Sequence, residues 1–470
     1  MKQLRNNLRR VGVFLCIMLA VLAAYGAYSV IVNGNRWFSS ASNTFMSRKK
    51  KEVIPGQILD RNGMVLAFND ASRPDQDGMP KRVYHPNPAV RMAMVHAVGD
   101  DKNRVDKGVE SFMTASLYGF DMSMAERLSC FMQGKKRVGD DVHLTLDAAL
   151  SAYATSLFPA DKKGALVVMN YKTGEVLTEI SLPQFDPEGF ASETAAQNRA
   201  VRVMYAPGST FKIITTASAL ENDEGVAERA YQCTGVLQVG DGTRNVTDAG
   251  NAVHGQLTLQ RAFQVSCNNT FARVALNLGD EKLKKTAERF GFNDNFLFRT
   301  LVVENSSYPS ENRTETEIAW TGVGQSELLV TPMHMCLVAS AVANEGVMME
   351  PYAVARTVAH NGDTRSVTQP RVYRRAMETD TAARLKEYMR LVVTGGTGTA
   401  ANIPGVRVCG KTGSAQLDTQ ENTNAWFVGF MDDPAHPYAI AIVVEDAGGG
   451  GSVAAPIARQ VFEWMLQNGY

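Results

Sequence analysis

The 470-residue chain has no excess of charge of either sign, because 48 Lys and Arg residues are balanced by 48 Asp and Glu residues. Nucleic-acid-binding proteins usually carry a basic excess, so the balance gives no support to that class of function. The sequence also has no internal repeat and no low-complexity tract. Hydrophobic residues make up 45% of the chain and charged residues 20%, which is typical of folded domains with packed cores. The length predicts two or three domains.

Cysteine is scarce, and its spacing is irregular. No two of the six cysteines form a CxxC pair, so a metal knuckle is not indicated, and we expect neither a metal nor a cofactor. One or two disulfides would suit an oxidising compartment, but small buried thiols are the preferred interpretation. His254 and His334 do not fall at a ligand spacing and are interpreted as structural or surface residues. The cysteines are Cys16, Cys130, Cys233, Cys267, Cys336 and Cys409.

Charge is also missing from Val11 to Val32, directly after a basic segment of ten residues that contains no acid. A helix of about 20 apolar residues spans a bilayer core, and this run meets that length. The basic flank should stay in the cytoplasm, which places the rest of the chain outside. A cleaved signal peptide is the alternative, although its apolar core would be shorter, at about 7–15 residues. Both interpretations predict an extracytoplasmic protein.

The remaining chain indicates an α/β (α+β) protein. A turn at Asp60–Gly63 and a second turn within residues 164–182 each predict a β-hairpin, and Asp147 is a predicted helix N-cap. Late strands and a C-terminal helix suggest a sheet that combines early and late segments. We expect a tail at 1–10, an anchor at 11–32, a non-catalytic domain at 33–145 and a catalytic domain at 146–470.

A serine and a lysine lie one helical turn apart in the segment YAPGSTFKIITTASAL, which contains Ser209 and Lys212. Residues at this spacing share a helix face, so the hydroxyl and the amine should be presented together. Serine needs a neighbouring base, and lysine can serve only if burial or a nearby cation lowers its pKa. The pattern alone is weak, because S-x-x-K arises by chance about once or twice in a chain of this length.

Two more motifs follow in order and strengthen that interpretation. The segment VSCNNTFARVAL contains Ser266-Cys267-Asn268 ahead of a helical pattern, and VCGKTGSAQ contains Lys411-Thr412-Gly413-Ser414 after a strand pattern. The combination of S-x-x-K, S-x-N and K-T-G occurs in penicillin-binding proteins and β-lactamases. Cys267, in the middle of the second motif, is interpreted as a packing residue.

The chain resembles the class B penicillin-binding proteins, the monofunctional transpeptidases of bacterial cell-wall synthesis. The resemblance covers almost the whole chain: the short tail and anchor, GQILDRNGMVLA, LTLDAAL, the three motifs, and TGVGQSELLVTPMHMCLVASAVANEGVMMEPY. It implies a penicillin-recognising serine transferase fold. That fold has a mixed β-sheet flanked by helices and a helical subdomain, preceded here by a non-catalytic domain and one transmembrane helix.

The resemblance also implies roles for five catalytic residues. Ser209 would attack the carbonyl between two D-alanines of a donor stem peptide, and Lys212 would accept its proton. Ser266 would relay a proton toward the leaving D-alanine. Asn268 would hydrogen-bond Lys212 and the substrate amide. Lys411 would lower the pKa of Lys212 and attract the terminal carboxylate.

Three further residues are expected to bind the substrate. Thr412 and Ser414 would offer hydroxyls to the terminal carboxylate, and Gly413 would let the substrate backbone lie close. The backbone N–H groups of Ser209 and Ser414 would form an oxyanion hole. An amine from a neighbouring stem peptide would then take the acyl group, and a β-lactam would acylate Ser209 almost irreversibly.

Other activities share these motifs. A D,D-carboxypeptidase or endopeptidase would use water in place of the acceptor amine, and a β-lactamase or a non-catalytic scaffold or sensor are further alternatives. The anchor and the domain ahead of the motifs favour the transpeptidase. The resemblance implies a location in the cell membrane with the catalytic domain outside, and a membrane-embedded glycan polymerase as partner. It does not separate elongation, division and sporulation roles.

Overall fold

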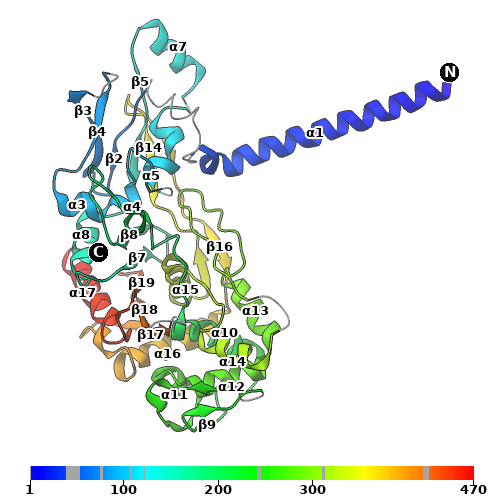
Figure 1. Cartoon of the computed structure of the whole chain (residues 1–470), viewed down its shortest axis with the longest axis vertical. Coiled ribbons are helices and arrows are strands. Elements are labelled where there is room, and N and C mark those ends of the chain that lie inside the picture. Colours follow the sequence, from blue (N-terminus) through cyan, green and yellow to red (C-terminus); the bar gives the residue numbers. More distant parts are fainter. Residues whose placement is uncertain are drawn as a thin grey trace.

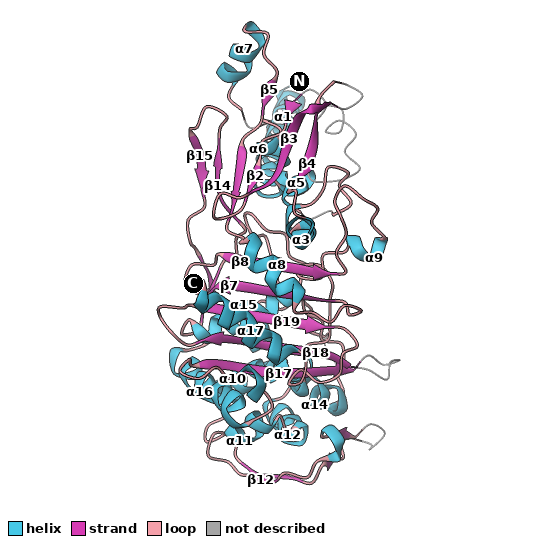
Figure 2. Cartoon of the chain, turned by 90° about the vertical axis from the view of Figure 1, so that its left-hand side faces the viewer, coloured by secondary structure: helices cyan, strands magenta, loops and turns pink. Residues whose placement is uncertain are grey.

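The computed structural model is an elongated body from which one long helix projects (Figure 1). The structure describes residues 2–38, 53–74, 78–105, 108–120, 122–240, 245–309, 313–416 and 423–470. A six-stranded sheet lies toward one end of the body, and a five-stranded sheet lies near the middle. Helices cover the five-stranded sheet and continue to the opposite end (Figure 2).

The six-stranded sheet belongs mainly to the N-terminal part of the chain. Its order is β15 (Thr364–Val367), β14 (Val354–Val358), β6 (Asp141–Leu144), β2 (Ile58–Leu59), β3 (Val65–Pro74) and β4 (Pro80–Tyr84). The hairpin predicted at Asp60–Gly63 is confirmed, because β2 and β3 pair antiparallel on either side of it. Strand β6 pairs parallel with β2 and antiparallel with β14. Residues 354–367, which the sequence assigned to the second domain, therefore complete the sheet of the first.

Short helices and one small strand pair surround this sheet. The pair is β1 (Val53–Ile54) with β5 (Arg137–Val138), and it is parallel. The buried pair Arg82 and Glu110, 2.6 Å apart, ties β4 to the helices beside it. The helices are α3 (Pro88–Ala93), α4 (Val95–Val98), α5 (Val109–Phe112), α6 (Thr114–Leu117) and α7 (Met124–Met132).

The five-stranded sheet brings early and late segments together, as the sequence suggested. Its order is β17 (Val408–Gln416), β18 (Thr423–Met431), β19 (Tyr438–Val444), β7 (Gly164–Asn170) and β8 (Val176–Leu182). The predicted hairpin within residues 164–182 is confirmed as β7 and β8. The resemblance implied a mixed sheet, and that prediction is corrected here, because all four pairings of the five-stranded sheet are antiparallel. Three of these pairs are also neighbours in sequence, joined by at most six residues, and a connection that short reverses the chain. The fourth pair, β19 with β7, joins a late strand to an early one.

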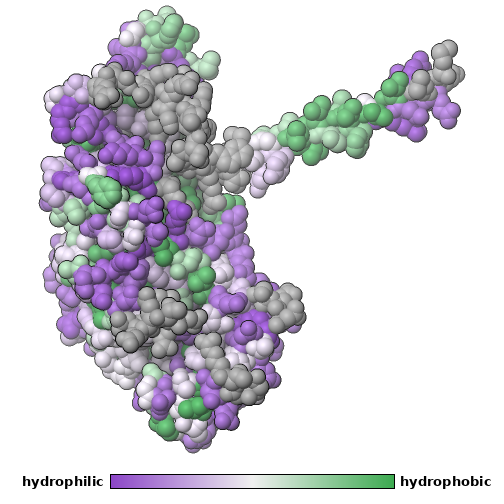
Figure 3. All heavy atoms as spheres, viewed as in Figure 1, coloured by the Kyte–Doolittle hydropathy of each residue, from purple (hydrophilic) through white to green (hydrophobic). Residues whose placement is uncertain are grey.

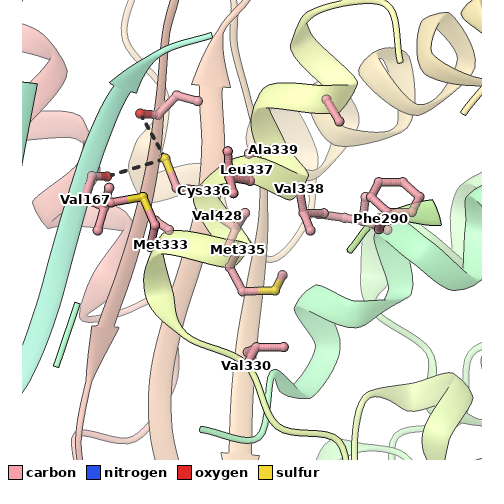
Figure 4. Close-up of a cluster of buried hydrophobic side chains, with 14 of the residues drawn as sticks. Val167, Phe290, Val330, Met333, Met335, Cys336, Leu337, Val338, Ala339 and Val428 are labelled. Carbon is pink, nitrogen blue, oxygen red and sulfur yellow. Dashed lines mark hydrogen bonds between the residues drawn. The ribbon is translucent and has the colours of Figure 1, made fainter. Parts of the chain in front are cut away.

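Both faces of this sheet are buried. Along β19, Ala441 and Val443 belong to one apolar cluster, whereas Ile440 and Ile442 belong to the other. Helix α15 (Pro332–Ala343) packs on the first face, and all of its residues are buried. Figure 4 shows α15 beside the strands of this face, with the Cys336 sulfur directed at two strand carbonyls. Helices α8 (Ala148–Ser156), which Asp147 caps as predicted, and α17 (Ala454–Gln467) cover the second face (Figure 2).

A helical subdomain lies next to the edge strand β17. It buries aromatic side chains such as Phe211, Phe263 and Phe271 in the same cluster as α15. The middle of the chain also contains short two-stranded pairs: β9 (Tyr231–Cys233) with β12 (Gly255–Leu257), β10 (Val236–Leu237) with β11 (Val246–Thr247), and β13 (Val347–Met349) with β16 (Val372–Arg375). The helices are α10 (Lys212–Asn222), α11 (Leu259–Val265), α12 (Asn268–Leu278), α13 (Asp280–Arg289), α14 (Glu315–Val323) and α16 (Thr379–Gly395).

The projecting helix is α1 (Lys2–Phe38), and it contains the predicted anchor. Within it, the 25 residues Arg5–Ser29 are long and apolar enough to cross a membrane, and none of that apolar window is buried against the rest of the chain. Figure 3 shows the apolar band between two polar ends. The helix thus fits a single-pass membrane anchor.

Candidate active site

The first motif lies where a 3₁₀ turn, η1 (Gly208–Phe211), passes directly into α10. Gly208 has φ +55°, and a Cβ at this position would lie 3.1 Å from the carbonyl oxygen of Ser414. Glycine therefore lets η1 lie close against β17 without strain. Ser209 is half-buried, and Lys212 is fully buried beneath it. The predicted serine and lysine pair thus lies at a helix start, as expected.

Three hydrogen bonds hold the Lys212 amine. Its Nζ lies 2.7 Å from the carbonyl oxygen of Ser266, 3.1 Å from the Ser266 hydroxyl and 2.7 Å from Oδ1 of Asn268. Burial lowers the pKa of Lys212 to about 7. This shift favours the neutral amine, which is the form that can accept a proton from serine.

The second motif joins two helices of the subdomain. Ser266 ends α11 in the left-handed conformation, with φ 61°, and Asn268 begins α12. Left-handed backbone is uncommon for a residue other than glycine, and it is enriched at functional sites. The Asn268 side chain donates to the Thr247 carbonyl at 2.8 Å, and its backbone N–H donates to Asp248. These contacts fix the amide oxygen toward Lys212.

The third motif lies on β17, the strand at the edge of the five-stranded sheet. Its Lys411 is fully buried, and Nζ lies 2.9 Å from the Ser266 hydroxyl and 3.1 Å from the Thr412 carbonyl. Burial and the neighbouring Lys212 hold the pKa of Lys411 well below its ordinary value. The Thr412 hydroxyl shares a 2.6 Å hydrogen bond with Thr397, and Ser414 accepts one from the Gly450 N–H at 3.4 Å.

Both lysines therefore contact one hydroxyl, that of Ser266. Two ammonium groups this close in a buried site repel each other, so each disfavours the protonated form of the other. The hydroxyl can donate to whichever amine is neutral and accept from the one that is charged. The arrangement can thus hold one proton and move it between the two amines.

A cavity of ≈ 270 Å³ opens above these groups. Predicted residues of all three motifs line it, and the two lysines lie beneath its floor. An adjoining cavity of ≈ 310 Å³ is also lined by Ser209 and extends toward Trp320 and Gln325. The predicted residues on the first wall are Ser209, Ser266, Asn268, Thr412, Gly413 and Ser414.

The structure also adds residues that the sequence analysis did not place in the site. Gly449, Gly450 and Gly451 line the first cavity. Thr397 lines it too, within the glycine and threonine segment at residues 393–400, which resembles a loop that the family has ahead of the third motif. Asp248 and His254 reach the cavity from the strand pairs, and nothing in the local sequence marks either as part of it.

Comparisons with known proteins agree with this geometry. Residues 164–463 match the family described as "Penicillin binding protein transpeptidase domain". The chain is 29% identical to "Peptidoglycan D,D-transpeptidase PbpA" of Mycolicibacterium smegmatis, over 99% of this chain and 100% of that protein. An imipenem acyl-enzyme complex of penicillin-binding protein A from M. tuberculosis is 28% identical. The match covers 89% of this chain and 99% of the chain in that complex, with a TM-score of 0.80. A D,D-transpeptidase domain from Eggerthella lenta is 30% identical and covers 89% of this chain and 99% of that one, with a TM-score of 0.76.

Proposed function

This chain belongs to the penicillin-binding proteins, within the class B transpeptidases, and from that premise we propose which of its residues carry each step of the reaction. The protein is a serine-type peptidoglycan D,D-transpeptidase that cross-links stem peptides through an acyl-serine intermediate and is acylated by β-lactams. Ser209 is the nucleophile in our proposal, since it faces the cavity. Lys212, one turn further on and buried with a lowered pKa, takes its proton.

The proton then has to reach the leaving D-alanine. Ser266 is suited to pass it on, because its hydroxyl contacts both Lys212 and Lys411. This double contact is the observation on which the assignment rests. The terminal carboxylate of the donor would favour the protonated form of Lys411. That leaves Lys212 as the neutral base, held in place by Asn268.

The reaction needs an oxyanion hole for the attacked carbonyl and a strand edge that binds the donor peptide. We assign the hole to the backbone N–H groups of Ser209 and Ser414, from two elements that approach closely at Gly208. Among the described strands, β17 lies at the edge of its sheet and pairs on one side only, so an extended donor peptide can lie along the other side. A Cβ at Gly413 would lie 3.1 Å from Pro207, Thr210 and Trp426, so glycine lets the segment before α10 lie close to this strand. In our proposal Gly413 also lets the substrate backbone lie close. Thr412 and Ser414 would bind the carboxylate.

We also propose the bounds of the domains and their position relative to the membrane. Residues 146–470 form the catalytic domain apart from strands β14 and β15, which complete the sheet of the 33–145 domain. The basic first ten residues lie in the cytoplasm, and the domains after α1 lie outside it. A membrane-embedded glycan polymerase is the proposed partner. Helix α1 and the first domain are where we place that contact.

The test uses the full-length chain in detergent. Parent and Ser209→Ala proteins are incubated with a penicillin and then examined by intact-protein mass spectrometry. We expect one adduct on the parent and none on the variant. A donor peptide ending in D-alanyl-D-alanine, supplied with an amine acceptor, should give amide product with the parent alone. Product that carries water in place of the amine would instead assign a carboxypeptidase.

A further inference from the structure

Four potential metal ligands meet directly behind the second motif. They are the sulfurs of Cys233 and Cys267, Nδ1 of His254 and a carboxylate oxygen of Asp248, and these atoms all lie within 4.8 Å of one another. They come from separate places: the end of β9, the segment after β11, the residue before β12, and the N-cap of α12. Two cysteines, a histidine and an aspartate form a ligand set that suits zinc.

The distances between the ligand atoms match a tetrahedral site. Zinc bonds of about 2.0–2.3 Å place tetrahedral ligand atoms about 3.3–3.8 Å apart. Oδ2 of Asp248 lies 3.1 Å from the Cys233 sulfur, 3.4 Å from the Cys267 sulfur and 3.8 Å from Nδ1 of His254. The Cys233 sulfur lies 3.5 Å from the same nitrogen. The other two pairs lie within 4.8 Å, so shifts of about 1 Å or less would seat the ion.

The surroundings also favour a bound cation. Cys233 and Cys267 are fully buried, and the Asp248 side chain is 1% exposed. Burying a carboxylate is costly unless it is paired or binds a metal. Within the described residues, its one ion-pair partner is His254, at 3.8 Å. Thr270 directs its N–H and its hydroxyl at the Cys267 sulfur, at 3.4 and 3.3 Å. Such bonds orient a ligating thiolate.

The local fold gives such an ion a structural task. In the part that the structure describes, residues 231–257 form only strands of two or three residues and one 3₁₀ turn, η2 (Ala249–Asn251). Small regions without a large core are commonly held together by a metal. All four positions are filled by protein, which is typical of structural rather than catalytic zinc.

We propose that Cys233, Asp248, His254 and Cys267 bind one zinc ion that fixes the catalytic Ser266–Asn268 segment to the β9–β12 strand pair. Cys267 lies between the two catalytic residues and points away from the cavity. Asp248 gives one oxygen to the cluster, and its other oxygen accepts the Asn268 backbone N–H. Zinc binding displaces the two thiol protons to solvent and leaves both sulfurs as thiolates.

The ion also accounts for two residues that the sequence analysis interpreted otherwise. Cys267 was interpreted as packing, and His254 as structural or surface. Neither belongs to a short cysteine or histidine motif, so the usual spacing rules could not find them. The ligands converge only once the strand pairs and α12 have folded together.

The first test measures zinc in the full-length chain, purified in detergent without a metal-affinity step and dialysed against metal-free buffer. We expect about one zinc per chain by elemental mass spectrometry. Cys233→Ser and His254→Ala should each lose it. Cys409→Ser is the matched control, because Cys409 is equally buried but lies outside the cluster, and this variant should keep its zinc.

A second test keeps the proposal falsifiable if the variants fail to fold. The parent chain is stripped with a chelator and refilled with Co²⁺, whose thiolate charge-transfer absorption reports coordination by cysteine. The expected result is this absorption, together with slower penicillin acylation after stripping that zinc restores. A parent chain with neither zinc nor the cobalt signal would overturn the proposal. So would a non-reduced peptide map in which the peptides of Cys233 and Cys267 are joined by a disulfide.

Discussion

The Nζ atom of Lys411 donates a hydrogen bond to the hydroxyl of Ser266 at 2.9 Å. That hydroxyl is also 3.1 Å from Nζ of Lys212, so a strand, a helix end and a helix start meet at a single oxygen. Both amines are buried, and the pKa of each is lowered. The lowered pKa values favour a neutral amine in this pair, which supplies a base without any other acceptor.

Removing the amine of the proposed base should slow acylation while leaving the nucleophile in place. Lys212→Ala is expected to reduce the rate of penicillin acylation by at least about 10²-fold, the low end for loss of a general base. Stopped-flow fluorescence with a labelled penicillin measures this rate. Lys285→Ala removes an exposed lysine of α13 and should keep the parent rate. Acylation of the Lys212 variant at the parent rate would reassign the base.

The acylation rate should also depend on pH in a defined direction. Lys212 acts only when neutral, and its pKa is lowered to about 7 by burial. The rate at low penicillin concentration should be constant above that value and fall about tenfold for each pH unit below it. The titratable groups next to Lys212 are Lys411, Asp248 and Cys267. A rate that rises as pH falls from 8 to 6 would contradict a neutral lysine base.

Local features were predictable from the sequence because each depends on a few adjacent residues. The hairpin of β7 and β8, the Asp147 cap and the serine and lysine spacing in η1 and α10 all belong to this group. The two short strands at residues 354–367 were not predictable from the sequence, since they join a sheet whose other strands lie more than 200 residues earlier. Pairing over such a distance leaves no local periodicity.

The site also has features that the sequence predicts and features that only the folded chain shows. The three motifs identify Ser209, Ser266 and Lys411, but their order along the chain does not show that Ser266 contacts both lysines. The glycine loop at residues 449–451 was found only through the cavity that it lines. Asp248 and His254 approach Cys267 through the pairing of β9 with β12, which is a long-range contact between strands of three residues each.

Helix α15 should be essential for stability, because it fills one face of the catalytic sheet. Leu337 is fully buried in it (Figure 4), and Leu337→Ala should cost about 2–5 kcal/mol and lower the melting temperature by roughly 4–10 °C. Leu128→Ala, in α7, removes a side chain that is 59% exposed and should leave the melting temperature unchanged. Equal melting temperatures for the two variants would mean that α15 packs less tightly than the structure indicates.

The close approach of η1 to β17 predicts a further effect that is specific to geometry. Gly208→Ala places a Cβ 3.1 Å from the Ser414 carbonyl and 3.2 Å from the Ala415 side chain, at φ +55°. The two elements must separate, which displaces the Ser209 nucleophile from the proposed oxyanion donors. Contacts of 3.1–3.2 Å require shifts of a few tenths of an ångström, and displacements near 1 Å can cost about 10²-fold in rate. We therefore expect acylation to slow by about 3–10-fold.

Backbone strain alone must be distinguished from this displacement. Gly405 also has a positive φ, +79°, but nothing lies within 4 Å of a Cβ there. Gly405→Ala therefore imposes a similar strain, about 1–2 kcal/mol, at a turn outside the cavity. It should lower the melting temperature much as Gly208→Ala does and leave the acylation rate unchanged. If both variants acylated at the parent rate, the contact between Gly208 and β17 would not position the nucleophile. If both were equally slow, strain rather than the position of Ser209 would govern the rate.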